Sequence, residues 1–225
     1  MTECAVVIGA GGVGAALVVA LLAEGREVAI LGRKTTPPLE LSDEASIAAA
    51  AAHVAAIGVP RLVIDATGFL HGEGFMPERS WRDLDPAHMA HAFAVNAIGP
   101  ALLMKHFLPL LPRLGRSVFA TLSARVGSIG DNRLGGWYSY RASKAALNQL
   151  VRTAAVELRR RSPESVCVAL HPGTVETGLS APFTRAGLNV RSADVAATEL
   201  LATIARLGPS DSGGFFDHKA AAIPW

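Results

Sequence analysis

The sequence predicts an α/β protein, a single domain with a doubly wound parallel β-sheet and helices on both of its faces. Short apolar runs rich in valine or isoleucine recur along the 225 residues, and most precede a helix-like stretch. Alternation of strands and helices is typical of a parallel sheet with helical crossovers. Because 50% of the residues are hydrophobic, we expect residues 1–225 to form one unit around a sizeable core.

Five strands are predicted from these runs. In chain order they are CAVVIG, EVAILG, RLVIDATG, SVFATLS and SVCVALHPG. A first helix is expected from about Gly12 to Glu24, because Gly25 suits the left-handed position after a helix. A second helix is expected to be capped by Ser42, to continue through an alanine-rich stretch and to end at Gly58.

The third predicted helix contains prolines. It begins at Asp85 with Pro86 in its first turn and reaches about Leu111, and Pro100 and Pro109 are expected to bend or break it. The remaining predicted elements are a fourth helix around Tyr140, a fifth over residues 192–207 and a last short strand at GGFFD.

Charge and cysteine content exclude several classes of protein. The 21 basic and 19 acidic residues leave a net charge of +2, so neither nucleic acid nor an anionic membrane is expected as a partner. Cys4 and Cys167 lie in strand-like runs and are expected to be buried thiols in a reducing cytoplasm. The N-terminal stretch lacks the basic region of a signal peptide, and the seven histidines show no metal-ligand spacing. We therefore expect a cytoplasmic protein without a metal site.

A glycine-rich turn follows the first predicted strand. The sequence VVIGAGGVGAAL places glycines at positions 9, 11, 12 and 14, between the strand and the first helix. Small residues at this point let the backbone approach a pyrophosphate, which the N–H groups and the dipole of the helix N-terminus then hold. The context of strand, turn and helix favours a dinucleotide site of the Rossmann type over a turn without a ligand.

Tyr140 and Lys144 lie four residues apart in YSYRASKAALN, so a helix places them on one face. A nearby ammonium favours the phenolate, and it would lower the pKa of the tyrosine from its usual value of about 10. Such a pair suits proton transfer near neutral pH. The alternative is a helix that carries both residues by chance.

The chain resembles the short-chain dehydrogenase/reductase family over nearly its whole length, and it looks most like the C-factor-like bacterial branch. The motifs that carry the resemblance, in the order of that family, are the glycine turn, LELSD, DATG, VNAIG, LSARVG, YSYRASKAALN and HPGTVET. The resemblance implies a nicotinamide cofactor. It implies that Tyr140 donates and accepts the proton, and that Lys144 lowers the pKa of Tyr140 and binds the nicotinamide ribose. Asn96 would join a proton relay through water, although a buried asparagine also needs structural hydrogen bonds.

Other candidate cofactor residues follow from the same resemblance. At the glycine turn they are Gly9, Gly11, Gly12, Val13 and Gly14; elsewhere they are Glu40, Leu41, Ala66, Thr67, Gly68, Pro172, Gly173, Val175 and Thr177. Glu40 takes the place of the aspartate in the family's Asp-Leu-Thr pattern at the adenine end. Arg33 and Lys34 follow the second strand, where an NAD site carries an acid, and a guanidinium can bind a 2′-phosphate. NADP(H) is therefore expected in preference to NAD(H).

Two departures from the family pattern affect the site. Without a gap, Ile8 would take the place of the first family glycine; a one-residue deletion gives that place to Gly9, which a tight turn favours. The family's second serine, which hydrogen-bonds the substrate carbonyl, is replaced by Ala124. We expect Ser123 to provide the missing hydroxyl, with Ser128 as the alternative.

These observations predict a cytoplasmic NADP(H)-dependent oxidoreductase that acts on a carbonyl or a secondary alcohol. Trp137 and Phe183 are candidate apolar walls of the substrate pocket. An epimerase or dehydratase would need a larger substrate region than residues 176–190 provide. A signalling or cofactor-binding protein with weak turnover remains the alternative from another class, and the family resemblance implies a homodimer or homotetramer.

Overall fold

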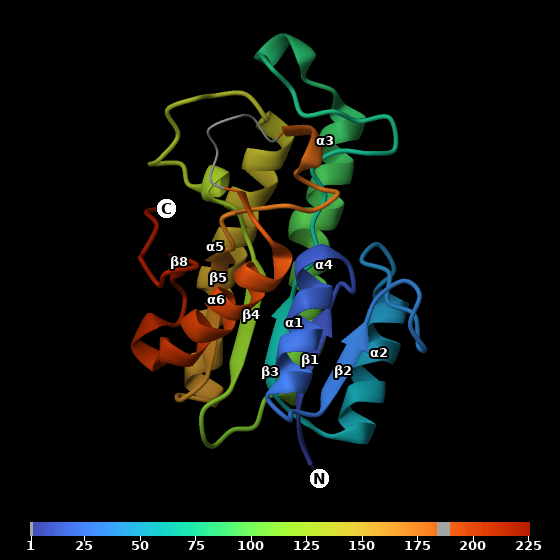
Figure 1. Ribbon diagram of the computed structural model, residues 1–225, viewed down its shortest axis with the longest axis vertical. Coiled ribbons are helices and arrows are strands. Elements are labelled where there is room, and N and C mark those ends of the chain that lie inside the picture. Colours follow the sequence, from blue (N-terminus) through green and yellow to red (C-terminus); the bar gives the residue numbers. More distant parts are fainter. Residues whose placement is uncertain (1, 184–189) are drawn as a thin grey trace.

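The centre of the molecule is a six-stranded sheet in which every neighbouring pair of strands is parallel. Figure 1 shows it in a computed structural model that describes residues 2–183 and 190–225. The strand order is β2-β1-β3-β4-β5-β8. The strands are β1 (Glu3–Ile8), β2 (Val28–Leu31), β3 (Val59–Asp65), β4 (Val118–Leu122), β5 (Val166–His171) and β8 (Phe215–Asp217). The predicted fold class is confirmed.

Helices cover both faces of this sheet (Figure 1). They are α1 (Gly12–Ala23) and α6 (Ala193–Arg206) on one face, and α2 (Glu44–Ile57), α4 (Gly99–Phe107) and α5 (Tyr138–Arg161) on the other. Successive strand residues point to opposite faces. In β1, Val6 and Ile8 therefore pack with α2, α4 and α5, whereas Ala5 and Val7 pack with α1 and α6.

The chain reverses its direction of winding between β1 and β3. The crossover through α1 leads from β1 to β2 on one side, and the crossover through α2 returns to β3 on the other. In open α/β sheets, ligands bind outside the carboxyl ends of the strands at such a switch point. The glycine turn after β1 and the segment after β3 both lie there.

The second helix has a different cap from the predicted one. Its N-cap is Asp43, whose carboxylate accepts a hydrogen bond from Ala45 N at 3.0 Å, so the prediction of Ser42 as the cap is wrong. Ser42 instead donates to Glu40 through both its N–H and its hydroxyl group. The Glu40 carboxylate therefore holds Ser42 outside the helix.

The third predicted helix is three consecutive segments. They are α3 (Pro86–Phe93), a π-helical turn (Ala94–Ile98) and α4, with a 3₁₀ turn (Leu108–Leu110) at the end. Pro100 does not break the helix but lies in the first turn of α4, and the π-helical turn comes directly before α4. The α-helical donor to the Asn96 carbonyl would be the N–H of residue 100, which proline lacks. π-turns of this kind often mark functional sites.

Shorter elements complete the described part of the chain. They are β6 (Thr174–Val175) paired with β7 (Val190–Arg191), and 3₁₀ turns at Trp81–Asp83, Arg125–Gly127, Ala181–Phe183 and Pro209–Asp211. Within that part, one helical run, Pro86–Leu110, is long and apolar enough to cross a membrane. It packs beside α2 and α5, and a buried core helix passes the same test.

Candidate functional site

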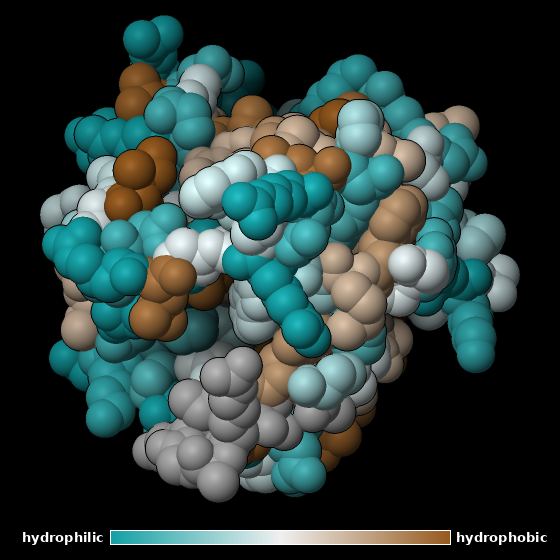
Figure 2. Space-filling model, turned by 90° about the horizontal axis from the view of Figure 1, so that it is seen from above, coloured by the Kyte–Doolittle hydropathy of each residue, from teal (hydrophilic) through white to brown (hydrophobic). Residues whose placement is uncertain are grey.

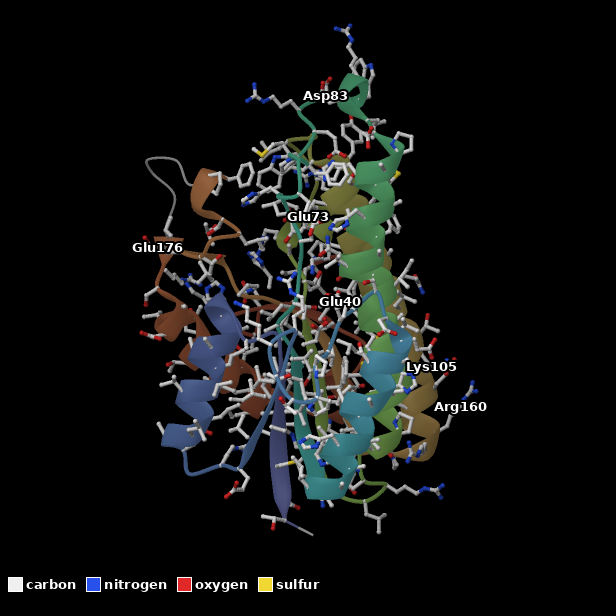
Figure 3. All side chains as sticks on the ribbon, turned by 90° about the vertical axis from the view of Figure 1, so that its right-hand side faces the viewer. Glu40, Glu73, Asp83, Lys105, Arg160 and Glu176 are labelled. Atoms are coloured by element: carbon white, nitrogen blue, oxygen red, sulfur yellow. The ribbon has the colours of Figure 1, made fainter. Side chains whose placement is uncertain are left out.

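The predicted site residues gather at the carboxyl edge of the sheet, which is the upper end in Figure 1. Figure 2 views this end from above and shows apolar residues among polar ones. Figure 3 labels Glu40 and Glu176, which lie on either side of this edge. Five separate connections meet here, namely those that follow β1, β2, β3, β4 and β5.

The glycine turn is shaped by close backbone packing. Gly9 has a φ of +96°, whereas Ile8 is the last, fully buried residue of β1, so the turn starts at Gly9 as the one-residue deletion predicts. A Cβ on Gly14 would lie 1.7 Å from the Gly9 carbonyl oxygen, so only glycine fits there. Gly11 has open space around it and caps α1, whose N–H groups face the turn. These residues fit a pyrophosphate.

The other cofactor candidates lie around this turn, and two of them have side chains that are buried in the hydrophobic core. Ala66 N donates to the Ile8 carbonyl at 2.8 Å, which holds the segment Ala66–Gly68 beside the turn. A Cβ on Gly12 would lie 3.0 Å from Thr177 Cγ2, so the segment from Pro172 to Thr177 covers the turn from above. The side chains of Val13 and Val175 are buried in the core, and their place at the site is structural.

The loop after β2 lies close to the glycine turn. Gly9 N donates to the Leu31 carbonyl at 2.8 Å, and a Cβ on Gly32 would lie 3.7 Å from Ala10 N. Arg33 and Lys34 follow and are exposed. A guanidinium at this point is free to reach a ligand on the turn.

The adenine-end candidates begin the α2 segment. The Glu40 carboxylate is bonded to Ser42, and Leu41 is buried against Gly99. The side chain of Leu41 therefore belongs to the core, and Glu40 is half-buried at the surface.

Tyr140 and Lys144 lie in the first two turns of α5, as predicted. Lys144 is 2% exposed, and its ammonium donates to the Leu122 carbonyl at 2.8 Å. Burial lowers the pKa of Lys144 to about 8 and raises the pKa of Tyr140 to about 12. The net pKa of Tyr140 is therefore raised, not lowered as the sequence predicts, because burial of the phenol disfavours the anion and the Lys144 ammonium is hydrogen-bonded to a backbone carbonyl rather than to the phenol.

Asn96 ties the π-turn to the segment after β3. Its side-chain oxygen accepts from Phe69 N at 2.8 Å, and its amide donates to the Phe69 carbonyl at 2.8 Å and to Ser143 Oγ at 3.1 Å. The residue is fully buried. Asn96 therefore has the structural hydrogen bonds that a buried asparagine needs. Through them its side chain aligns α5 with the edge of the sheet.

Glu78 holds the start of α5, a role that no sequence motif indicates. The N-cap of this helix is Trp137, which has a φ of +54° and no capping side chain. Trp137 N donates to the Glu78 carbonyl at 2.6 Å, and the Glu78 carboxylate accepts from Ser139 N at 3.2 Å. A buried acid at a helix N-terminus is favoured by the helix dipole. Glu78 and Ser139 are 61 residues apart in the sequence, and their hydrogen bond positions the helical turn that carries Tyr140.

The two serines proposed as substitutes for the family serine already donate elsewhere. Ser123 Oγ donates to Asn148 Oδ1 at 2.7 Å, and Ser128 Oγ donates to the Pro224 carbonyl at 2.5 Å. Both residues are buried, whereas Ala124 is partly exposed in extended backbone. A hydrogen bond from Ser123 to a substrate requires the bond to Asn148 to break.

Aromatic rings line the approach to Tyr140. Trp137 lies edge-to-face with Tyr140 at 6.2 Å and with Phe183 at 5.2 Å, and Phe183 contacts the His71 ring at 5.4 Å. His71 Nε2 also lies 3.1 Å from the Gly178 carbonyl, which joins the loops on the two sides of the site. The two predicted apolar walls are adjacent in the structure.

Polar side chains support the Pro172–Thr177 segment from below. A Cβ on Gly173 would lie 2.6 Å from Arg191 Nη1 and 3.4 Å from His218 Nδ1, and Arg191 pairs with Glu199 at 3.2 Å. Burial, together with the charge of Arg125, lowers the pKa of His171 to about 4. His171 and His218 both have ring nitrogens without a partner among the described residues.

Comparison with known proteins identifies this arrangement. A family model described as enoyl-(acyl carrier protein) reductase matches residues 12–206. The chain belongs to the short-chain dehydrogenase/reductase family. It is therefore an oxidoreductase of a family that typically uses NAD(P), with a small-molecule substrate, as the sequence predicts.

Among curated relatives, C-signal of Myxococcus xanthus is 39% identical over 144 residues, which cover 64% of this chain and 82% of C-signal. This similarity confirms the predicted likeness to the C-factor-like branch. The 1-hydroxy-2-glutathionyl-2-methyl-3-butene dehydrogenase of Rhodococcus sp. (strain AD45) is 32% identical over 210 residues, which cover 93% of this chain and 88% of the relative.

Two solved structures share the fold over the whole chain. The NADPH-bound carbonyl reductase from chicken fatty liver has a TM-score of 0.86 and 29% identity, and the match covers 100% of this chain and 99% of that one. The carbonyl reductase Sniffer of D. melanogaster has a TM-score of 0.85 and 21% identity, with 100% of both chains covered, and this second likeness shows the fold alone.

Proposed function

We propose that the chain is an NADP(H)-dependent carbonyl reductase. The observation that carries the proposal is that the start of α5, with Tyr140 and Lys144, and the glycine turn both border residues 66–68 at the switch point of the sheet: Lys144 Nζ lies beside Gly68, and Gly9 packs on Ala66 and Thr67. A phenol whose pKa is raised to about 12 holds its proton at neutral pH, so it is suited to donate one to a carbonyl oxygen.

The residues at the carboxyl edge fit a dinucleotide. The glycine turn and the N-terminus of α1 would hold its pyrophosphate, and the segment from Pro172 to Thr177 would border its nicotinamide. When bound, the cofactor supplies the hydride for the carbonyl carbon. The chain's own residues provide orientation, the proton and the electrostatic environment.

Tyr140 would place its hydroxyl on the carbonyl oxygen and give up its proton as negative charge develops there. The Lys144 ammonium would stabilise the resulting phenolate. The Asn96 carbonyl, which lacks its α-helical donor because of Pro100, is suited to bind a water that returns the proton. Trp137 and Phe183 would exclude bulk water and bind the apolar part of the substrate.

The preference for NADP(H) is supported by Arg33. The guanidinium is exposed in the loop beside the glycine turn, where it can bind a 2′-phosphate through charge-assisted hydrogen bonds. The NADPH in the chicken carbonyl reductase structure agrees with this proposal. Titration of the protein with NADPH and with NADH tests it directly.

A signalling or cofactor-binding role with weak turnover is the second candidate. Ala124 in place of the family serine, the engaged hydroxyls of Ser123 and Ser128 and the similarity to C-signal favour it. The two candidates differ in one measurement, NADPH consumption with a broad panel of aldehydes and ketones. Sustained turnover supports the reductase; tight NADPH binding without turnover supports the second candidate.

A further inference from the structure

Asp65 is a buried acid at the carboxyl end of β3 that the proposed reaction does not use. Its side chain is fully buried. One carboxylate oxygen accepts from Thr67 N at 3.0 Å and from Thr67 Oγ1 at 2.5 Å, and the other accepts from Thr121 Oγ1 at 2.6 Å. All three donors are neutral. A carboxylate removed from water is costly without a cation, so its surroundings need to be considered.

Lys144 provides a cation close to Asp65. Asp65 lies opposite Thr121 in the pairing of β3 with β4, and the next residue of β4, Leu122, accepts the hydrogen bond from Lys144 Nζ. A Cβ on Gly68, three residues after Asp65, would lie 3.6 Å from that same Nζ atom. The two charges do not form a direct ion pair, but both are buried, where solvent screens them little.

Within residues 2–183 and 190–225, the other polar groups near Lys144 on α5 and on the π-turn are neutral. Tyr140 and Ser143 precede it on α5, and Asn96 Oδ1 lies beside Gly68 as Lys144 Nζ does. The turn Arg125–Gly127 packs on the Lys144 side chain through Gly127, while the Arg125 guanidinium is directed to Asp131. Burial lowers the pKa of Lys144 to about 8, and Asp65 acts in the opposite direction. Burial also raises the pKa of Asp65, while its bonds from Thr121 and Thr67 and the charge of Lys144 lower it.

We propose that Asp65 is a positioning residue for Lys144, a buried counter-charge that keeps the ammonium protonated and bonded to Leu122. The proposal goes beyond the family pattern, and its consequence for turnover rests on the proposed function. Without Asp65, the lysine loses its proton at lower pH. The stabilisation of the Tyr140 phenolate then fails under mildly alkaline conditions.

Asp65→Asn removes the charge and keeps the shape. The amide oxygen still accepts from Thr67, and the amide N–H₂ donates to Thr121 Oγ1 once that hydroxyl rotates. Asp194→Asn, which neutralises an exposed acid at the start of α6, away from Lys144, is the matched control.

The readout is NMR titration of ¹³C-labelled lysine. The chain has four lysines, at positions 34, 105, 144 and 219, and Lys144→Arg assigns the signal of interest. We expect its titration midpoint to fall by about one pH unit or more in Asp65→Asn, a tenfold change in proton affinity. The other lysines in Asp65→Asn, and Lys144 in the Asp194→Asn control, should keep their midpoints. An unchanged Lys144 midpoint in Asp65→Asn would overturn the proposal.

A reciprocal measurement covers the case in which Asp65→Asn does not fold. Two coupled sites shift each other by the same free energy, so Lys144→Met must raise the midpoint of the Asp65 carboxyl by an equal amount. A constant Asp65 midpoint would contradict the coupling. In Asp65→Asn, the pH at which the rate of carbonyl reduction falls on the alkaline side should decrease together with the NMR titration midpoint of Lys144. If the wild type reduces no carbonyl while the NMR shift is present, the proposed function fails and the role of Asp65 stands.

Discussion

At the scale of single residues, the site combines groups that sequence motifs can identify with groups that they cannot. Tyr140, Lys144 and Asn96 come from recognisable motifs. Glu78 and Asp65 do not, because each acts on a residue distant in the sequence. For Asp65 a weak signal exists, an acid that ends the apolar run RLVID, whereas nothing marks Glu78.

Arg33→Ala is expected to remove most of the preference for NADPH. A charge-assisted contact to a 2′-phosphate contributes roughly 1.5–3 kcal/mol, which is about one to two powers of ten in affinity. NADH affinity should remain nearly unchanged, because NADH has no such phosphate. Fluorescence titration with both cofactors measures the effect. Arg26→Ala, at the opposite end of the sheet, is the control, and equal NADPH and NADH affinities in the wild type would rule out the assignment.

Ala124→Ser is expected to raise carbonyl turnover, by up to about 10²-fold, because it adds a donor at the position where the family has one. Ser123→Ala should have a small effect if the Ser123 hydroxyl stays on Asn148. Rates of the two variants on one substrate distinguish these cases. A loss of about 10²–10³-fold in Ser123→Ala would instead show that Ser123 turns to the substrate, as the sequence predicts.

At the scale of elements, local signals predicted the strands and helices well. Five apolar runs became β1 to β5, and Gly25 ended α1 within one residue, because these features depend on nearby residues. The cap of α2 and the π-turn were missed. The choice of Asp43 over Ser42 depends on a local hydrogen bond from Ser42 to Glu40. The π-turn depends on Pro100, which lacks the α-helical donor, and on the contact of Asn96 with Phe69, 27 residues away. Neither kind of contact leaves a periodic pattern in the sequence.

His171, at the end of β5, is expected to make the free energy of unfolding depend on pH. Burial lowers the pKa of His171 from 6.5 to about 4, so the unfolded chain binds a proton more readily than the folded one. The contribution of the neutral His171 to the free energy of unfolding is therefore fully present above about pH 6.5, and it decreases as the pH falls toward about 4. Between about pH 7 and pH 5 the free energy of unfolding should fall by about 2 kcal/mol through this residue.

Urea unfolding at both pH values measures this decrease, and His171→Gln should reduce it. The exposed His53 provides the control substitution, His53→Gln. His218, whose pKa burial also lowers, adds to the slope in the same direction. An equal decrease in the wild type and in His171→Gln would mean that His171 does not carry the effect.

At the scale of the whole molecule, topology brings five loops and one helix to a single edge of the sheet. The fold class, the family and the position of the site were predictable, because the order of strands and the glycine turn determine where a dinucleotide binds. The protonation states of the site residues could not be predicted from the sequence. The pKa values of Tyr140 and Lys144 are set by burial, which depends on how Trp137, Glu78 and the β4 edge surround the start of α5.

The most direct test of the account is the rate of NADPH oxidation with a panel of aldehydes and ketones, measured for the wild type, Tyr140→Phe and Tyr138→Phe. The chain has two tyrosines, so Tyr138→Phe is a matched control within the same helical turn. We predict turnover in the wild type and in Tyr138→Phe, and a loss of about 10²–10⁴-fold in Tyr140→Phe with NADPH affinity unchanged. Equal rates in Tyr140→Phe and the wild type, or NADPH binding without turnover on any carbonyl, would contradict it.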